Sequence, residues 1–173
     1  MAEETKDATN KLDIIHNIQK TLYAADFDLN AFMELVVNEM MQLTPADAVV
    51  IELASNKDMV YRAGTGELAN YKGLRLPIKG SISGLCVESK EVLLSNDTET
   101  DSRVNLEACR KVGARSLVVA PLFNNEDAVG VLKILSNKPN IFTPEHVKIL
   151  QIVAGFLGTA LANQIYTEIR NSI

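Results

Sequence analysis

Apolar side chains recur at helical spacing in the first quarter of the chain. Over residues 11–24 they fall three or four positions apart, which predicts a helix. A second helix is expected to follow, capped by Asp26 or Asp28. It should end at Thr44, because the residue before Pro45 avoids the helical region. The first part of the domain is therefore predicted to be a pair of helices.

The central part of the chain has the pattern of strands. β-rich or extended segments, bounded by polar turns, occur at residues 48–53, 59–63, 74–78, 92–94, 116–123 and 128–135. Asn124 and Asn125 separate the last two segments and tolerate positive φ, so these two strands should form an antiparallel hairpin.

Three further helices are predicted around these strands. Ser81 can cap a short helix over 82–89, and another over 104–111 should end at Gly113. The last helix begins at 143–145 with a cap, a proline and an acid, and runs to about residue 170.

This order of elements predicts an α+β domain with one antiparallel sheet of about six strands. The terminal helices should cover one face, and the helix and loop segment of roughly 73–111 should form a lid over the other. A lidded sheet is a place to hold a small molecule. Residues 1–10 are expected to be frayed, and 11–173 to form a single domain.

Charge and cysteine content narrow the function. The net charge of −5 argues against nucleic acid or anionic lipid as a partner, since both require a basic patch. Cys86 and Cys109 form no CxxC pair, which favours a reducing, cytoplasmic setting. Residues 149–167 carry no charge, but polar residues and glycines interrupt them, so we expect no membrane span.

Several stretches carry a resemblance to a known family through their order and spacing. They are 76–84 with Gly80 and Gly84, 91–97, 101–103, 113–122, 128–132 and 142–163. With them, the chain resembles the GAF family of small-molecule sensor domains from about residue 28 to residue 165. The resemblance implies a sensory or regulatory role, an unidentified small ligand, and dimers formed through the terminal helices.

The residues exclude several of that family's ligands. Light-sensing members carry a Cys-His pair where this chain has Val104 and Asn105, so no bilin attachment is expected. His16 and His146 lie outside the lid segment, which argues against haem or a metal. The segment 137–145 departs from the cyclic-nucleotide motif in spacing, and a turn followed by a helix cap explains its residues. We therefore predict no cofactor.

An enzymatic function depends on the cysteines. One branch of the family reduces free methionine sulfoxide with cavity cysteines, and this chain has Ser83 where that branch has one of them. Cys109 falls near the second. A thiol redox cycle needs a nucleophile and a resolving partner, so we predict a non-enzymatic domain and keep the reductase as the alternative.

Polar side chains around the lid are the candidate ligand contacts. They are Ser81, Ser83, Asp97, Thr98, Arg103, Asn105, Cys109, Arg115 and Ser116. The two arginines have the geometry to hold a carboxylate or phosphate. The competing interpretation is that Asp97, Asp101 and Arg103 satisfy one another and the loop backbone.

The last helix carries two adjoining apolar stripes, which Tyr166 and Ile169 widen. One stripe can cover the sheet, and the other needs the first helix or a second subunit. We predict a homodimer through the terminal helices, whose shifts would be read by an output protein or domain. A ligand-free dimerisation scaffold remains a further alternative.

Overall fold

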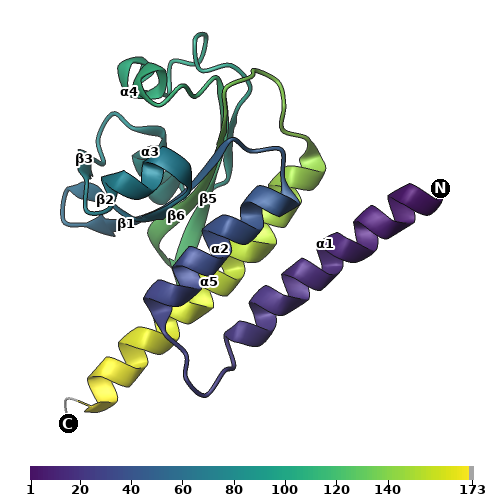
Figure 1. Cartoon of the computed structure of the whole chain (residues 1–173). Coiled ribbons are helices and arrows are strands. Elements are labelled where there is room, and N and C mark those ends of the chain that lie inside the picture. The colour runs from purple at the N-terminus through teal and green to yellow at the C-terminus, as the bar shows by residue number, and fades with distance from the viewer. Residues whose placement is uncertain (172–173) are drawn as a thin grey trace.

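A computed structural model describes residues 1–171, with side chains as far as Ile165. Its elements are α1 (Ala2–Thr21), α2 (Leu29–Leu43), β1 (Ala48–Ser55), β2 (Asp58–Gly64), the 3₁₀ helix η1 (Gly66–Tyr71), β3 (Arg75–Pro77), α3 (Ile82–Ser89), β4 (Leu93–Ser95), α4 (Leu106–Lys111), β5 (Ser116–Asn124), β6 (Asp127–Ser136) and α5 (Pro144–Asn171). Figure 1 shows α2 and α5 on one side of the sheet and α3 and α4 on the other.

One six-stranded sheet runs through the domain in the order β3-β2-β1-β6-β5-β4, with every neighbouring pair antiparallel. The prediction of an α+β domain with a single antiparallel sheet is confirmed. The β5–β6 hairpin turns where expected, with Asn125 at φ 57°. Strand β6 also pairs with β1, and this pairing joins the two halves of the sheet at its centre.

Alternate residues along the strands form an apolar core beneath α2 and α5. Val49 and Ile51 of β1 and Leu132 and Ile134 of β6 are fully buried in it. Helix α2 begins at the Asp28 cap, whose carboxylate accepts from the backbone N–H of Ala31 at 2.7 Å. This face of the sheet is therefore closed by apolar packing.

Both stripes of α5 are largely covered within one chain. The covered side chains include Ile149, Leu150, Val153, Leu157 and Leu161. Their covers are the sheet on one side and α2 with α1 on the other (Figure 1). Ile152 and Ile165 stay exposed, whereas the side chains of Tyr166 and Ile169 lie outside the described residues.

Helix α1 packs through Ile14 and Ile18, and its N-terminal half extends past the body of the domain (Figure 1). Residues 2–10, which we expected to be frayed, belong to this helix and are all exposed. Glu3 and Glu4 lie at the positive end of the helix dipole, which favours helix there.

Two short helices form the lid predicted over the second face. Gly84 lets α3 approach closely, since a Cβ there would lie 1.9 Å from the carbonyl oxygen of Ile78. Helix α4 begins at Leu106, two residues later than expected, because the side chain of Asn105 caps it by accepting from Ala108 N–H at 3.0 Å.

No helix within the described residues is long and apolar enough to cross a membrane. The expected cytoplasmic setting stays a prediction.

Candidate functional site

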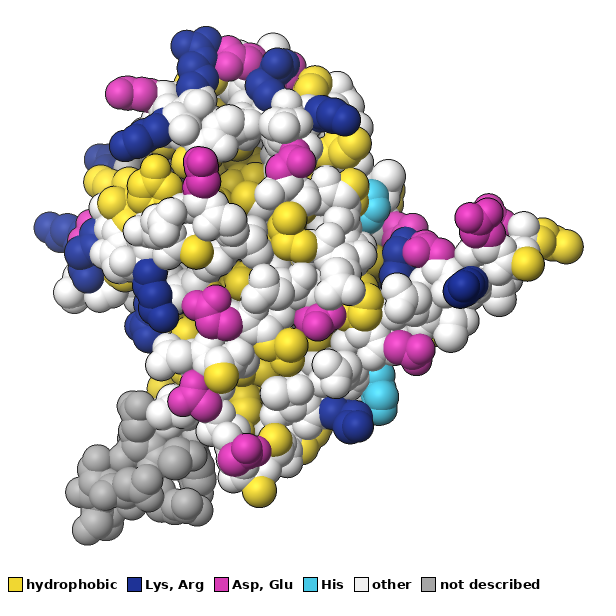
Figure 2. All heavy atoms as spheres, viewed as in Figure 1, with side chains coloured by type: hydrophobic (Ala, Val, Ile, Leu, Met, Phe, Trp, Pro, Cys, Tyr) yellow, Lys and Arg dark blue, Asp and Glu magenta, His cyan; other side chains and the backbone are white. Residues whose placement is uncertain are grey.

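A cavity of about 170 Å³ lies between the sheet and the lid helices α3 and α4. Most of its wall is apolar, with Leu76, Ile82, Leu117 and Leu135 among the lining residues. Leu74 and Val112 also line it and remain 38% and 39% exposed, so they mark its mouth. Figure 2 shows hydrophobic side chains reaching the surface on this side of the domain, below α4.

An ion pair is buried in the cavity wall. Glu52 of β1 is 1% exposed and Lys133 of β6 is 8% exposed, and the ammonium of Lys133 contacts Glu52 Oε1 directly. Ser83 of α3 joins them: its hydroxyl donates to Glu52 Oε1 at 3.0 Å and accepts from Lys133 Nζ at 3.2 Å. One polar cluster therefore ties the lid helix to the two central strands.

Glu52 keeps Lys133 charged. Burial opposes the charge on the ammonium, but the neighbouring carboxylate outweighs that effect, so the pKa of Lys133 lies above its ordinary value. A protonated lysine cannot accept a proton, which removes Lys133 as a general base. The pair acts instead as a fixed dipole in an apolar wall.

Tyr61 of β2 completes this end of the cavity. Its ring centroid lies 5.8 Å from Lys133 Nζ, within the range of a cation–π contact. Burial raises the pKa of Tyr61, so its hydroxyl stays neutral.

Four of the nine predicted ligand contacts line the cavity: Ser81, Ser83, Asn105 and Cys109. The polar atoms of two of them already serve helix caps. Ser81 Oγ accepts from Gly84 N–H at 2.9 Å, and Asn105 Oδ1 caps α4.

The other five predicted contacts do not line the cavity. They are Asp97, Thr98, Arg103, Arg115 and Ser116. Thr98 and Ser116 donate to the backbone carbonyls of Ala114 and Lys138. Ligand binding by any of the nine stays a prediction, but these five hold the loop together.

The arginines form ion pairs on the outside of the lid. Arg115 contacts Asp97 at 3.0 Å and Arg103 contacts Asp101 at 2.7 Å. These bonds hold the pKa of Asp97 and of Asp101 below their usual values. The arrangement agrees with the competing interpretation, in which the charges satisfy one another.

Sequence reasoning missed Glu52, Lys133 and Tyr61. A signal was present, because each charged residue interrupts an otherwise apolar strand at a position that alternation assigns to the sheet interior. Burying a charge costs free energy unless the charge is paired, so two charged residues of opposite sign on such strands suggest that they form an ion pair.

The two cysteines have different surroundings. Cys109 lines the cavity, and burial raises the pKa of its thiol. Cys86 does not line it; its thiol donates to the Glu91 carbonyl at 3.2 Å, and burial raises its pKa to about 12. Only the first is placed to meet a molecule in the cavity.

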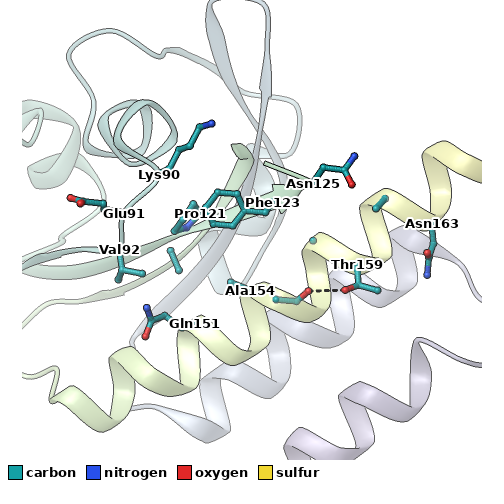
Figure 3. Close-up of a pocket in the computed structure, with 14 residues that line it drawn as sticks. Lys90, Glu91, Val92, Pro121, Phe123, Asn125, Gln151, Ala154, Thr159 and Asn163 are labelled. Atoms are coloured by element: carbon teal, nitrogen blue, oxygen red, sulfur yellow. Dashed lines mark hydrogen bonds between the residues drawn. The ribbon is translucent and has the colours of Figure 1, made fainter. Parts of the chain in front are cut away.

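A larger groove of about 800 Å³ follows α5 on the opposite side of the sheet. Figure 3 shows Phe123 and Pro121 of β5 beside Ala154 and Thr159 of α5. Its polar side chains are exposed, in contrast to the buried pair of the cavity. No group of residues suited to hold a metal ion occurs in the part of the chain that the structure describes.

Known proteins share the fold of this chain. A family model described as a GAF domain matches residues 28–162. The GAF domain of a phosphoenolpyruvate-protein phosphotransferase from Coxiella burnetii has a TM-score of 0.82 at 22% identity, covering 94% of this chain and 98% of that one.

A probable 3′,5′-cyclic phosphodiesterase of Caenorhabditis elegans is 22% identical over 187 residues. The alignment covers 99% of this chain but only 25% of that protein. This chain therefore spans about a quarter of the relative's length.

The free methionine-R-sulfoxide reductase of Neisseria meningitidis, solved with its substrate, has a TM-score of 0.77 at 19% identity, covering 92% of this chain and 93% of that one. At this identity the likeness shows the fold alone. The prediction of a non-enzymatic domain, which we based on the missing second thiol, is wrong: free methionine-R-sulfoxide reductases, which are enzymes, share this fold.

Proposed function

Because this chain belongs to the GAF domain family, many of whose members are sensory or regulatory, we propose that it binds a small molecule in the cavity beneath α3 and α4. Binding alters the position of these helices, and the change passes through the sheet to the terminal helices. An output protein or domain then responds to it.

The observation that carries this proposal is the buried Glu52–Lys133 pair in the cavity wall. Replacing a buried ion pair with apolar residues is often neutral or stabilising, so the pair contributes little to stability. Titratable groups buried in the wall of a mainly apolar cavity are instead typical of a ligand site.

The test is to extract freshly purified protein with denaturant and identify retained small molecules by mass spectrometry. Ala108→Phe should fill the cavity and abolish retention, since Ala108 lines it. Glu107→Phe places the same side chain on the exposed side of α4 and should retain the molecule. Equal recovery from both variants would contradict the proposal.

We also propose that the domain acts as a homodimer through its terminal helices. Leu12 of α1 is 66% exposed, and Ile152 and Ile165 of α5 are 38% and 42% exposed. Sedimentation equilibrium should show a dimer that Ile152→Lys with Ile165→Lys weakens. A monomer at tens of micromolar protein would contradict this part of the proposal.

A thiol-dependent sulfoxide reductase is the second candidate, and the position of Cys109 in the cavity favours it. The sulfur of the Cys109 thiol would attack the sulfoxide sulfur while its proton passes to the sulfoxide oxygen. Transfer of that hydroxyl to Cys109 would break the sulfoxide S–O bond, release the sulfide and leave a sulfenic acid on Cys109. Two molecules of an external thiol would then restore Cys109, yielding water and their disulfide.

This candidate predicts turnover of free methionine sulfoxide with dithiothreitol. Activity should disappear in Cys109→Ser. It should persist in Cys86→Ser, because Cys86 does not line the cavity. Absence of turnover by the native chain would rule this candidate out.

A further inference from the structure

The size of the cavity limits its ligand. Drug-sized ligands occupy pockets of roughly 300–1,000 Å³, whereas an apolar cavity of about 150 Å³ accepts benzene. The cavity here measures about 170 Å³. The part of a ligand that lies inside it therefore matches one six-membered ring with a small substituent, or an aliphatic group of similar volume.

The charge of the cavity wall limits the ligand further. The ammonium of Lys133 and the carboxylate of Glu52 neutralise each other and are almost completely removed from solvent. A ligand charge beside them would be desolvated without a counter-charge of its own, and burying an unpaired ion is strongly unfavourable. Among the described residues, one further charged side chain lines the cavity, that of Lys111, and it is exposed. The buried end therefore favours a ligand of no net charge.

Open hydrogen-bonding positions define the ligand's polar group. Glu52 Oε1 accepts from Lys133 and Ser83, while Oε2 accepts no hydrogen bond from the described residues. The hydroxyl of Tyr61 likewise accepts or donates no hydrogen bond within the described residues, and both Glu52 and Tyr61 line the cavity.

A carboxylate oxygen requires a donor from the ligand, and a tyrosine hydroxyl can donate to a ligand acceptor. We propose that the cavity selects a compact, uncharged molecule with an amide-like edge, whose N–H donates to Glu52 and whose carbonyl accepts from Tyr61. The proposal rests on the proposed function, because it specifies the ligand of the same cavity.

The test uses three probes of nearly identical shape: benzamide is neutral, benzoate is an anion and benzamidine is a cation. Their dissociation constants are measured at pH 7 by ligand-observed NMR and isothermal titration. We expect benzamide to bind at least tenfold more tightly than either charged probe. Equal or tighter binding of benzoate or benzamidine would overturn the inference and leave ligand binding in the cavity intact.

Saturable binding of none of the three would count against the proposed function as well as the inference. Binding that Ala108→Phe leaves unchanged would place the probe outside the cavity and would also overturn both.

Charge variants make the test independent of probe size. Glu52→Gln leaves an unpaired lysine and should shift the preference at least tenfold toward benzoate. Lys133→Met leaves an unpaired carboxylate and should shift it toward benzamidine. The double variant should again favour benzamide. Glu107→Gln and Lys148→Met remove exposed charges of the same signs and should leave the order unchanged.

If a single variant does not fold, the native protein and the double variant still test the inference, because neither contains an unpaired buried charge. If the order of the three dissociation constants is the same in every folded variant, the Glu52–Lys133 pair does not select a ligand by its charge, and the inference is overturned.

Discussion

The two faces of the sheet are built differently from the same strands. Beneath α2 and α5 the packed side chains are apolar, and the groove on this face has only exposed polar side chains along its edge. Beneath α3 and α4 the strands carry Glu52 and Lys133 next to a cavity. Alternation along β1 and β6 places the two kinds of residue on opposite faces, so each face can serve a separate purpose.

The two faces of the sheet should have different roles, one in stability and the other in ligand binding. The apolar face should contribute most of the folding free energy, since burial of large side chains is the dominant favourable contribution. The face beneath the lid includes an ion pair that adds little to stability and a space that adds none. Substitutions on the two faces should therefore affect stability and ligand binding differently.

The largest expected effect lies on the apolar face. Leu150 is fully buried on α5, and Leu150→Ala should lower the free energy of unfolding by about 3–4 kcal/mol. Benzamide affinity of the folded variant should stay within twofold of the native value. Urea unfolding followed by titration measures both, and a tenfold loss of affinity would show that the faces are not separable.

The ion pair should give the next largest effect. Lys133→Met leaves Glu52 buried without its partner, so we expect a loss of about 3 kcal/mol in unfolding free energy. Combining Glu52→Met with Lys133→Met should restore stability to within about 1 kcal/mol of the native chain. If the double variant were as unstable as the single, the pair would be a stabilising element.

Two glycines provide a matched pair across the sheet. A Cβ at Gly84 of α3 would lie 1.9 Å from the Ile78 carbonyl oxygen, and one at Gly158 of α5 would lie 2.5 Å from that of Phe123. Each alanine variant should cost about 1–3 kcal/mol, because a helix must move away from backbone. Only Gly84→Ala should also weaken benzamide binding, since α3 lines the cavity.

Gly155→Ala is the control on α5, because a Cβ there meets nothing within 4 Å. It should stabilise the helix by about 0.5–1 kcal/mol. Thermal unfolding of the three variants measures these changes in stability. Equal losses of benzamide affinity in Gly84→Ala and Gly158→Ala would contradict the expectation that only the face beneath α3 binds the probe.

Acid should produce the smallest effect, and it should act on the lid. Arg103 holds the pKa of Asp101 below its ordinary value, so their pair stabilises the fold at neutral pH. That stabilisation is lost as pH falls from about 4 toward the lowered pKa. Solvent around the exposed arginine limits the loss to about 1 kcal/mol. Urea unfolding between pH 3 and pH 7 should show a smaller acid dependence in Arg103→Gln, whereas Lys79→Gln should match the native protein.

Local patterns were enough to predict most of the fold. The caps at Asp28 and Ser81 and the turn at Asn125 involve neighbouring residues, and they lie where the sequence placed them. Alternation along the strands identified the sheet. The cover over the second stripe of α5 was expected to be the first helix or a partner subunit, which offer the same apolar chemistry. In the structure it is mainly α2, with a smaller contribution from α1.

The site was harder to predict because it depends on contacts between distant strands. Strand β1 pairs with β6 in a register that sets Glu52 opposite Val131 and Val50 opposite Lys133, which brings the two charges together diagonally. The sequence alone does not specify the register of β1 against β6. The exposed polar residues of the lid were more conspicuous, but Arg103 and Arg115 are occupied by acids in their own loop.

Binding of a small molecule beneath α3 and α4 can be observed by a ¹H–¹⁵N and methyl NMR titration of the native protein with benzamide. We expect saturable shifts concentrated on cavity residues such as Ile82, Ala114, Leu117 and Leu135, with little change at Leu150 and Leu157. Shifts centred on the α5 groove around Phe123 and Ala154, or no saturable shifts at all, would contradict this expectation.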